Sequence, residues 1–336
     1  IKLTIPASAY VGNARDAVYL VPRENNNNAM PLSAALKFIG EDHPLQSEGG
    51  SVPSYLPAKN LFIDIDPQKA LKVGMAKPGD TIAPRLNYTL PGSYISKDDL
   101  AILDVISSNM YERPIYFSVT VQRDKLMGLD DYFQLEGLGL RLMAVKSTSD
   151  PDFEIYGSGR VDANKVLENF STKFKWGGFD KKKMFVDKSY SPSVNAHKLV
   201  ALRATQDLIL SNQTEKAIKL MDTYFTGFPN FNFPYEQSML SFIRMYITAG
   251  AYDKAKTHMD IMAKMAVQNN TFFNSLTSAD LQTYTLRMEY EQNQNIMSEL
   301  INLAELGKDN AYAEDLKKMF GNNIKPKQNQ QGPLLN

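Results

Sequence analysis

Residues 96–146 read SKDDLAILDVISSNMYERPIYFSVTVQRDKLMGLDDYFQLEGLGLRLMAVK, and they carry the clearest signals of local structure in the chain. Ser96 followed by Asp99 is a capping-box pattern for a helix start, with Asp in place of the usual Glu. The apolar residues that follow recur at helical spacing and share one face: Leu100, Leu103, Ile106 and Met110. This part of the stretch predicts an amphipathic helix that begins at Ser96.

The rest of the stretch predicts two strands. Pro114 disfavours helical backbone at Arg113 and ends the helical pattern. Residues 115–121 follow as a β-rich run that is apolar on both faces at its start, which is typical of a strand covered on both sides. A short amphipathic turn around Leu129–Leu135 then leads to a second strand, Leu138–Val145. The unit is helix, strand, turn, strand, and by itself it indicates no chemistry.

Three segments of this unit carry a family resemblance: ILDVISSNMYERPIYFSVTV, GLDDYFQLEGL and RLMAVK. In this order they resemble the carboxy-terminal region of DUF2723, a polytopic bacterial membrane-protein family of unknown function found in Bacteroides and other Bacteroidetes. The resemblance covers roughly residues 50–180. Tyr111, which stands where the family has Trp, and Gly139 and Met143 depart from its pattern.

The resemblance implies that the chain is part of a membrane protein, but it implies no catalytic or ligand-binding residue in this chain. The amino-terminal half of the family is polytopic and similar to protein O-mannosyltransferases, so its catalytic acids are expected in that membrane half. No position of this chain inherits a catalytic, metal or cofactor role. The implied partners are the membrane-spanning half of the same polypeptide and an acceptor protein or glycan. The implied location is the periplasmic face of the inner membrane, and the lack of an initiator Met suggests that the chain has been separated from that half.

Composition excludes several function classes. The chain has 336 residues, of which 43% are hydrophobic and 22% are charged, values typical of a globular protein with a sizeable core. The 37 basic and 37 acidic residues cancel, so no overall field attracts nucleic acid. Cysteine is absent, which excludes disulfides and thiol catalysis. No apolar run approaches the roughly 18 residues that a membrane-spanning helix needs.

The order of expected elements divides the chain into a domain of strands and helices and an all-helical domain. Residues 1–170 alternate strands and helices, which predicts an α/β (mixed α+β) domain with a central sheet. Residues 171–193 hold six lysines and the single Trp without a sustained period, which is typical of a linker. Residues 194–320 predict only helices, and the polar residues 321–336 predict a disordered tail.

The helical half contains a weak internal repeat. NQTEKAIKLMDTY and AGAYDKAKTHMDI each place an alanine after a polar turn and before an amphipathic run. These alanines, Ala217 and Ala255, are close to one tetratricopeptide period apart once the Pro- and Phe-rich insertion 227–234 is allowed for. Small residues at such positions let paired helices approach closely. The pattern predicts a tetratricopeptide-like domain that binds a protein.

Two groups of residues are candidates for binding. The first gathers polar side chains around strand ends, where α/β sheets often bind ligands: Arg113, Asp130, Asp131, Glu136 and Arg141. They suit either a structural ion pair between Arg113, beside Pro114, and Glu136, beside Gly137, or a contact to glycan or peptide. The second is the aromatic cluster of the insertion: Phe228, Phe231, Phe233 and Tyr235. It either fills the space between helical hairpins or, through Phe231 and Tyr235, anchors a partner.

A different class of function stays open, that of a free-standing carbohydrate-active hydrolase. Asp130 and Glu136 would then be the two carboxyl groups that such an enzyme places on either side of the scissile bond. Asp64 and Asp66 leave the same face of a predicted strand and could share a divalent cation, but a solvated strand edge that runs into Pro67 is the preferred interpretation. The three histidines show no partner pattern, and no phosphate-binding loop motif occurs.

Overall fold

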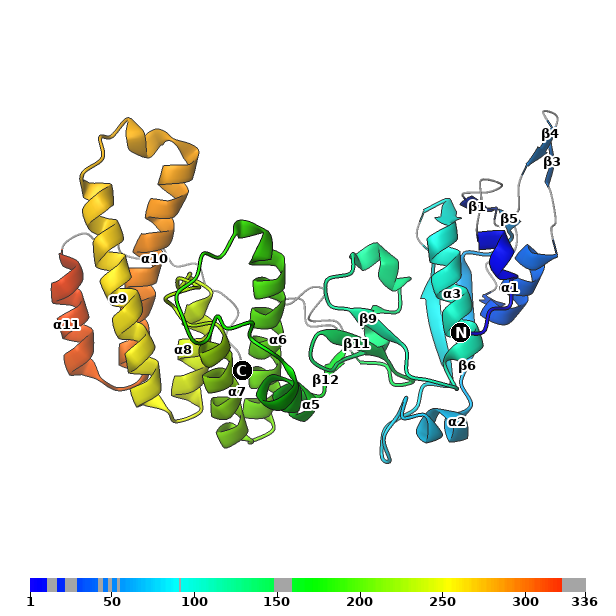
Figure 1. Cartoon of the computed structure of the whole chain (residues 1–336), viewed down its shortest axis with the longest axis horizontal. Coiled ribbons are helices and arrows are strands. Elements are labelled where there is room, and N and C mark those ends of the chain that lie inside the picture. The colour runs from blue at the N-terminus through cyan, green and yellow to red at the C-terminus, as the bar shows by residue number, and fades with distance from the viewer. Residues whose placement is uncertain are drawn as a thin grey trace. The chain divides into compact units, whose positions relative to one another are not determined.

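The computed structural model describes residues 1–10, 17–21, 29–41, 45–47, 50–52, 55–90, 92–147 and 159–321 (Figure 1). The chain forms two compact units. Unit 1 consists of Ile1–Val166 and Ser189–Arg203, and unit 2 consists of Leu167–Lys188 and Ala204–Asn336. Unit 1 combines strands and helices, whereas the C-terminal half is helical, so the predicted fold class is confirmed. The predicted tail lies outside the described residues except for Gly321.

The strands of unit 1 are divided among small sheets rather than gathered in one. The sheet with order β5-β1-β8 contains β1 (Ala17–Leu20), β5 (Tyr55–Leu56) and β8 (Tyr94–Ser96). The sheet with order β2-β6-β7 contains β2 (Met30–Pro31), β6 (Asn60–Asp64) and β7 (Arg85–Thr89). The sheet with order β12-β10-β11-β9 contains β9 (Tyr116–Ser118), β10 (Phe133–Leu135), β11 (Gly139–Leu142) and β12 (Arg160–Val161). A hairpin joins β3 (Leu45–Ser47) to β4 (Gly50–Val52).

The helices that accompany these strands follow the sequence signals closely. They are α1 (Leu32–Gly40), α2 (Pro67–Lys72), α3 (Lys97–Asn109) and α5 (Ala163–Glu168), the last of which continues into a π-helical turn at Asn169–Lys173. At the start of α3 the backbone N–H of Ser96 donates to Asp99 Oδ2 at 3.3 Å, and the Ser96 hydroxyl donates to the same oxygen at 2.7 Å. The four apolar residues predicted for the buried face of α3 are all buried.

A buried carboxylate on α3 fixes the start of the chain. Asp104 is fully buried and accepts hydrogen bonds from the backbone N–H groups of Thr4 at 2.7 Å and Ile5 at 2.9 Å. The Tyr10 hydroxyl donates to the same carboxylate at 2.8 Å. Burial, together with this acceptor, raises the pKa of Tyr10. One side chain on α3 therefore satisfies three donors from a segment about a hundred residues away in the sequence.

The strand predicted over residues 115–121 is shorter and more exposed than expected. It covers only Tyr116–Ser118, and the Tyr116 side chain is 49% exposed. The expectation that this strand is covered on both sides is wrong, because none of its three residues is buried. Among the strands that the structure describes, β9 pairs with β11 alone and so lies at the edge of its sheet.

The helical elements of the C-terminal half are α6 (Ser191–Leu210), α7 (Thr214–Gly227), α8 (Met239–Thr248), α9 (Tyr252–Asn274), α10 (Tyr284–Leu306) and α11 (Asn310–Phe320). Ala217 on α7 and Ala255 on α9 are both fully buried, as close helix pairing requires. Gly250 ends α8 with a positive φ of 81°, a conformation that glycine adopts without a steric penalty.

Aromatic rings fill the centre of unit 2. The Phe242 ring stacks on Tyr224 at 4.7 Å and meets Phe225 edge-on at 5.2 Å. The imidazole of His258 stacks on Phe225 at 4.0 Å. Phe228, one of the predicted plug residues, is buried and stacks on Tyr224 at 5.1 Å. Rings arranged in this way bury large apolar areas and add favourable ring–ring geometry.

Candidate functional site

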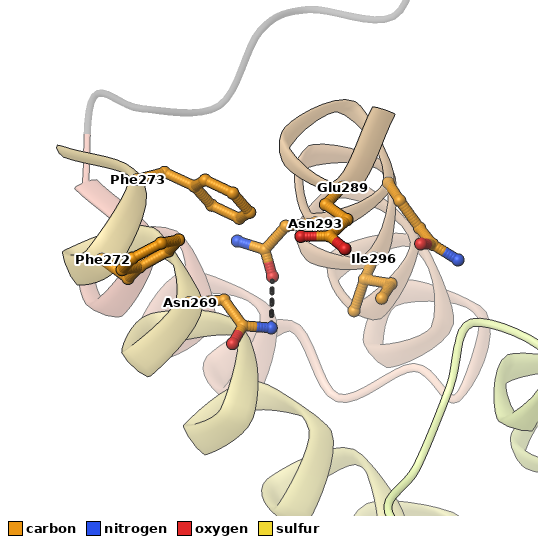
Figure 2. A pocket seen from close by; sticks show the side chains of 7 residues that line it. Asn269, Phe272, Phe273, Glu289, Asn293 and Ile296 are labelled. Atoms are coloured by element: carbon orange, nitrogen blue, oxygen red, sulfur yellow. Dashed lines mark hydrogen bonds between the residues drawn. The ribbon is translucent and has the colours of Figure 1, made fainter. Parts of the chain in front are cut away.

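A pocket of about 280 Å³ lies between α9 and α10, within unit 2 (Figure 2). Its wall is formed by Asn269, Phe272, Phe273, Glu289, Gln292, Asn293 and Ile296. The α9 residues belong to the last turns of that helix and the α10 residues to its first turns, so the pocket is near the end of the hairpin where the two helices are connected. Amide, carboxylate and phenyl groups therefore line the same pocket.

Two asparagines connect the two walls of the pocket. The Asn269 Nδ2 group donates to Asn293 Oδ1 at 3.4 Å, and Asn293 Nδ2 donates to the backbone carbonyl of Ala266 at 3.1 Å (Figure 2). Asn293 is only 2% exposed, so its side chain is held in one orientation. Each amide can form more hydrogen bonds than these, and Asn269 Oδ1 has no partner within the described part of the chain.

The phenyl groups and the carboxylate differ in exposure. Phe273 is buried and meets Tyr290 edge-on at 5.6 Å, whereas Phe272 is 50% exposed. Glu289 is exposed and forms no ion pair with any other described residue. The pocket thus offers a fixed amide pair, one accessible aromatic ring and one negative charge.

A smaller hollow of about 30 Å³ is adjacent and connects the pocket to one predicted residue. It is lined by Tyr235, Met262, Met265, Ala266, Asn269, Asn293 and Ile296. The hydroxyl of Tyr235 is 2.7 Å from His258 Nδ1. Burial lowers the pKa of His258 to about 4 and raises that of Tyr235. Phe231, the other aromatic residue predicted to contact a partner, is 47% exposed and lines neither hollow.

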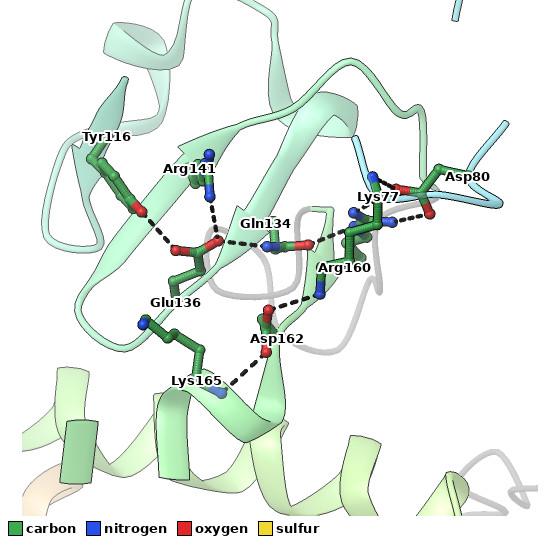
Figure 3. A network of polar contacts seen from close by, with 9 residues as sticks. All are labelled: Lys77, Asp80, Tyr116, Gln134, Glu136, Arg141, Arg160, Asp162 and Lys165. Carbon is green, nitrogen blue, oxygen red and sulfur yellow. Dashed lines mark hydrogen bonds and ion pairs between the residues drawn. The ribbon is translucent and has the colours of Figure 1, made fainter. Parts of the chain in front are cut away.

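A second polar group, in unit 1, brings together two of the predicted residues (Figure 3). Glu136 is buried at the end of β10 and accepts from the Tyr116 hydroxyl at 2.6 Å and from Gln134 Nε2 at 2.6 Å. Arg141 of β11 forms an ion pair with the same carboxylate at 3.5 Å. Burial and the neighbouring carboxylate raise the pKa of Tyr116 to about 12. Both oxygens of Glu136 are therefore engaged.

The network continues through Gln134 to a distant part of the chain. Gln134 Oε1 accepts from Arg160 Nε at 2.6 Å, and the guanidinium of Arg160 binds both oxygens of Asp80 at 2.8 and 3.0 Å (Figure 3). This bidentate contact lowers the pKa of Asp80. Beside it, Lys77 Nζ is 2.9 Å from Asp162. The network joins the loop after α2 to β10 and β12.

The remaining predicted polar residues lie outside this network. Asp130 pairs with Arg123 at 3.2 Å, and Asp131 pairs with Lys146 at 3.5 Å. Arg113 is exposed in the turn after α3, so the predicted ion pair between Arg113 and Glu136 is wrong: Glu136 pairs with Arg141 instead. The structure therefore unites Glu136 with Arg141 but separates Asp130 from Glu136 by giving each its own cationic partner.

The two aspartates considered for a cation have separate structural roles. Asp64 at the end of β6 pairs with Arg85 of β7 at 2.6 Å. Asp66 is the N-cap of α2 and accepts from the backbone N–H groups of Gln68 and Lys69 at 3.0 and 3.1 Å. Over the residues that the structure describes, no three acidic or histidine side chains gather in a way that could hold a metal ion.

The α9–α10 pocket was not predicted from the sequence. The signal that could have pointed to it is a pair of amide-rich runs, VQNNTFFN at 267–274 and EQNQN at 291–295, because amides on facing helices are unusual in an apolar seam. Neither run alone predicts a site. The two helices had to be paired before Asn269 and Asn293 could be placed together.

Of the comparisons with known proteins, the one with family models gave a match. Comparison with curated proteins and with solved structures gave no match. In the described ranges no helix combines the length and hydropathy that crossing a bilayer demands. Residues 1–165 match the model of the family described as TMEM260-associated domain 2, so this part of the chain is similar to a domain associated with a membrane protein.

Proposed function

We propose that this chain is a non-catalytic, extracytoplasmic part of a polytopic, glycosyltransferase-like membrane protein, in which it binds an acceptor protein or glycan. The observation that carries the proposal is the match of residues 1–165 to a membrane-protein-associated domain, in a chain that continues into a helical unit with a pocket. The resemblance of residues 50–180 to the tail of DUF2723 supports the same setting, at the periplasmic face of the inner membrane.

In this proposal the two units have different tasks. Unit 1 connects to the membrane-spanning half of the same polypeptide, and unit 2 holds the acceptor. Holding an acceptor near a membrane active site raises its effective concentration there and needs no chemistry in this chain. A binding role of this kind also suits the pocket, whose fixed amides and accessible ring offer contacts to a ligand.

The contacts of the two carboxylates considered for hydrolysis favour a structural role over a catalytic one. Glu136 already accepts from Tyr116 and Gln134 and pairs with Arg141, so its oxygens are occupied by the protein itself. Asp130 is paired with Arg123. A glycosidase acid and nucleophile must instead both face the scissile bond.

The proposed membrane location is tested by the upstream gene sequence and by protease accessibility in cells. We expect the coding sequence upstream of the codon for Ile1 to encode roughly a dozen hydrophobic spans of some 20 residues each. We also expect protease added to spheroplasts, but not to intact cells, to cleave an epitope placed in the segment 322–336. A complete reading frame that starts shortly before Ile1, or an epitope that protease reaches only after cell lysis, would contradict the proposal.

A further inference from the structure

We infer that the α9–α10 pocket binds an extended peptide segment in which a lysine or arginine is adjacent to a large apolar side chain. This inference rests on the proposed acceptor-binding function and narrows the acceptor to a protein. Three properties of the pocket carry it: its charge, its paired amides and its exposed apolar rim.

The charge of the hairpin end favours a cationic ligand. Residues 265–296 contain three acidic residues and one basic residue, a net charge of −2. Arg287 pairs with Glu291 at 3.3 Å, and Asp280 accepts hydrogen bonds from Thr277. Glu289 on the pocket wall has no cationic partner among the described side chains. The carboxylate of Glu289 is exposed, and a lysine or arginine side chain of a ligand could form an ion pair with it.

The asparagine pair favours a peptide backbone. A carboxamide places a donor and an acceptor side by side, which matches the C=O and N–H of a peptide group. Buried Asn293 is held by its bond to the carbonyl of Ala266, and exposed Asn269 contacts it through one long hydrogen bond of 3.4 Å. The oxygen and the second N–H of Asn269 remain for the ligand. Because Asn293 orients the amide of Asn269, a ligand would lose less binding energy in ordering that amide.

The rim supplies the apolar contact. Phe272 is half exposed on the α9 side. On α10, Tyr284 and Met288 are both exposed, and Met288 is one turn from Gln292 of the pocket wall, so their side chains are neighbours on one helix face. A volume of about 280 Å³ is at the lower end for ligand pockets and suits one or two side chains rather than a folded domain.

The test uses the full 336-residue chain and fluorescein-labelled peptides of the form Gly-Ser-Φ-Lys-Φ-Gly-Ser, where Φ is Leu, Ile, Phe or Tyr. Matched peptides carry Glu in place of Lys. Fluorescence anisotropy should give saturable binding of at least one lysine peptide below about 1 mM, and at least tenfold weaker binding of its glutamate partner. Binding should weaken about two- to fivefold in Glu289→Gln and about tenfold in Phe272→Ala. Glu314→Gln, the same change on α11, should bind like the unaltered chain.

The site is located with chain labelled at the methionine methyl groups. The Met288 signal, assigned with Met288→Leu, should shift on addition of the lysine peptide. Equal binding of lysine and glutamate peptides, no binding by any peptide of the set, or a Met288 shift with methyl mannoside but not with peptide would overturn the inference. These outcomes are independent of the upstream gene sequence, so failure here leaves the proposed membrane setting to its own test.

Discussion

Unit 1 is stabilised by one kind of internal contact and unit 2 by another. In unit 1 short strands and helices are joined by polar groups that reach across the sequence, such as buried Asp104 to Thr4 and partly buried Asp80 to Arg160. In unit 2 long helices pack through stacked rings, with Phe242 and Tyr224 at the centre. A fold of the first kind depends on specific partners, and a fold of the second kind depends on buried area and shape. The comparison predicts that the two units respond to different substitutions.

The largest effect is expected from Phe242→Ala. The ring is fully buried between Tyr224 and Phe225, so its removal should lower the free energy of unfolding of unit 2 by about 4 kcal/mol. Denaturant unfolding followed by Trp176 fluorescence measures this, because Trp176 is the only tryptophan and contacts Phe228 of unit 2. Phe231→Ala, at an exposed position, is the control and should change stability by less than about 0.5 kcal/mol. Equal losses of stability in the two variants would show that the stacked rings do not stabilise unit 2 specifically.

Glu136→Gln should give the next largest effect, confined to unit 1. The substitution removes the buried carboxylate that is the counter-charge of partly buried Arg141 and should cost about 3 kcal/mol. Hydrogen exchange of the β10 and β11 amides measures the loss locally. The control is Glu112→Gln, which breaks an exposed ion pair with Lys2 and should leave these exchange rates unchanged. Unchanged protection in Glu136→Gln would show that the network is not structural.

The pH dependence of unit 2 should contain a contribution from His258. Its pKa is lowered from 6.5 to about 4 by burial, so between these values the unfolded chain binds a proton that the folded unit does not. Stability from this group is therefore present above pH 6.5 and falls by about 3 kcal/mol as the pH decreases to 4. His258→Gln should flatten this part of the stability curve. An NMR titration of the three imidazoles supplies the direct value, and a His258 pKa near 6.5 would contradict the prediction.

The smallest of these effects is expected from Gly227→Ala. A Cβ at this position would lie 2.6 Å from the Trp176 ring, which must then shift. Overpacking of this kind costs about 1–3 kcal/mol, and the displaced indole should emit at longer wavelength. Gly40→Ala is the control because its added Cβ makes only an ordinary contact with Ile5 at 3.8 Å. An unchanged emission spectrum in Gly227→Ala would mean that the Trp176 segment does not pack on α7.

The same contrast explains what could be predicted from the sequence. The helices depend on neighbouring residues, so their presence agrees with the patterns: α3 begins after Ser96 as predicted, and its apolar face is buried as expected. The division of the strands into small sheets could not be predicted, because strand pairing depends on residues far apart. Tyr116 shows this: it belongs to an apolar run but is half exposed at a sheet edge.

The candidate sites follow the same rule. The sequence placed Glu136 in a structural ion pair but with the wrong arginine: its partner is Arg141, five residues on across the β10–β11 pair, and not Arg113. The extension of this pair to Arg160 and Asp80 could not be predicted, since these residues come from separate segments. The α9–α10 pocket needs Asn269 and Asn293 to meet across a helix pair, and no local pattern indicates that register.

We propose that the polar network of unit 1 has a structural role and that the α9–α10 pocket of unit 2 is the binding site. The most direct test is the affinity of the lysine peptide for the unaltered chain, for Glu136→Gln and for Glu289→Gln, measured at a temperature where all three are folded. Relative to the unaltered chain, we expect weaker peptide binding in Glu289→Gln alone and a lowered Tm in Glu136→Gln alone. Weaker binding in Glu136→Gln with unchanged binding in Glu289→Gln would contradict this proposal.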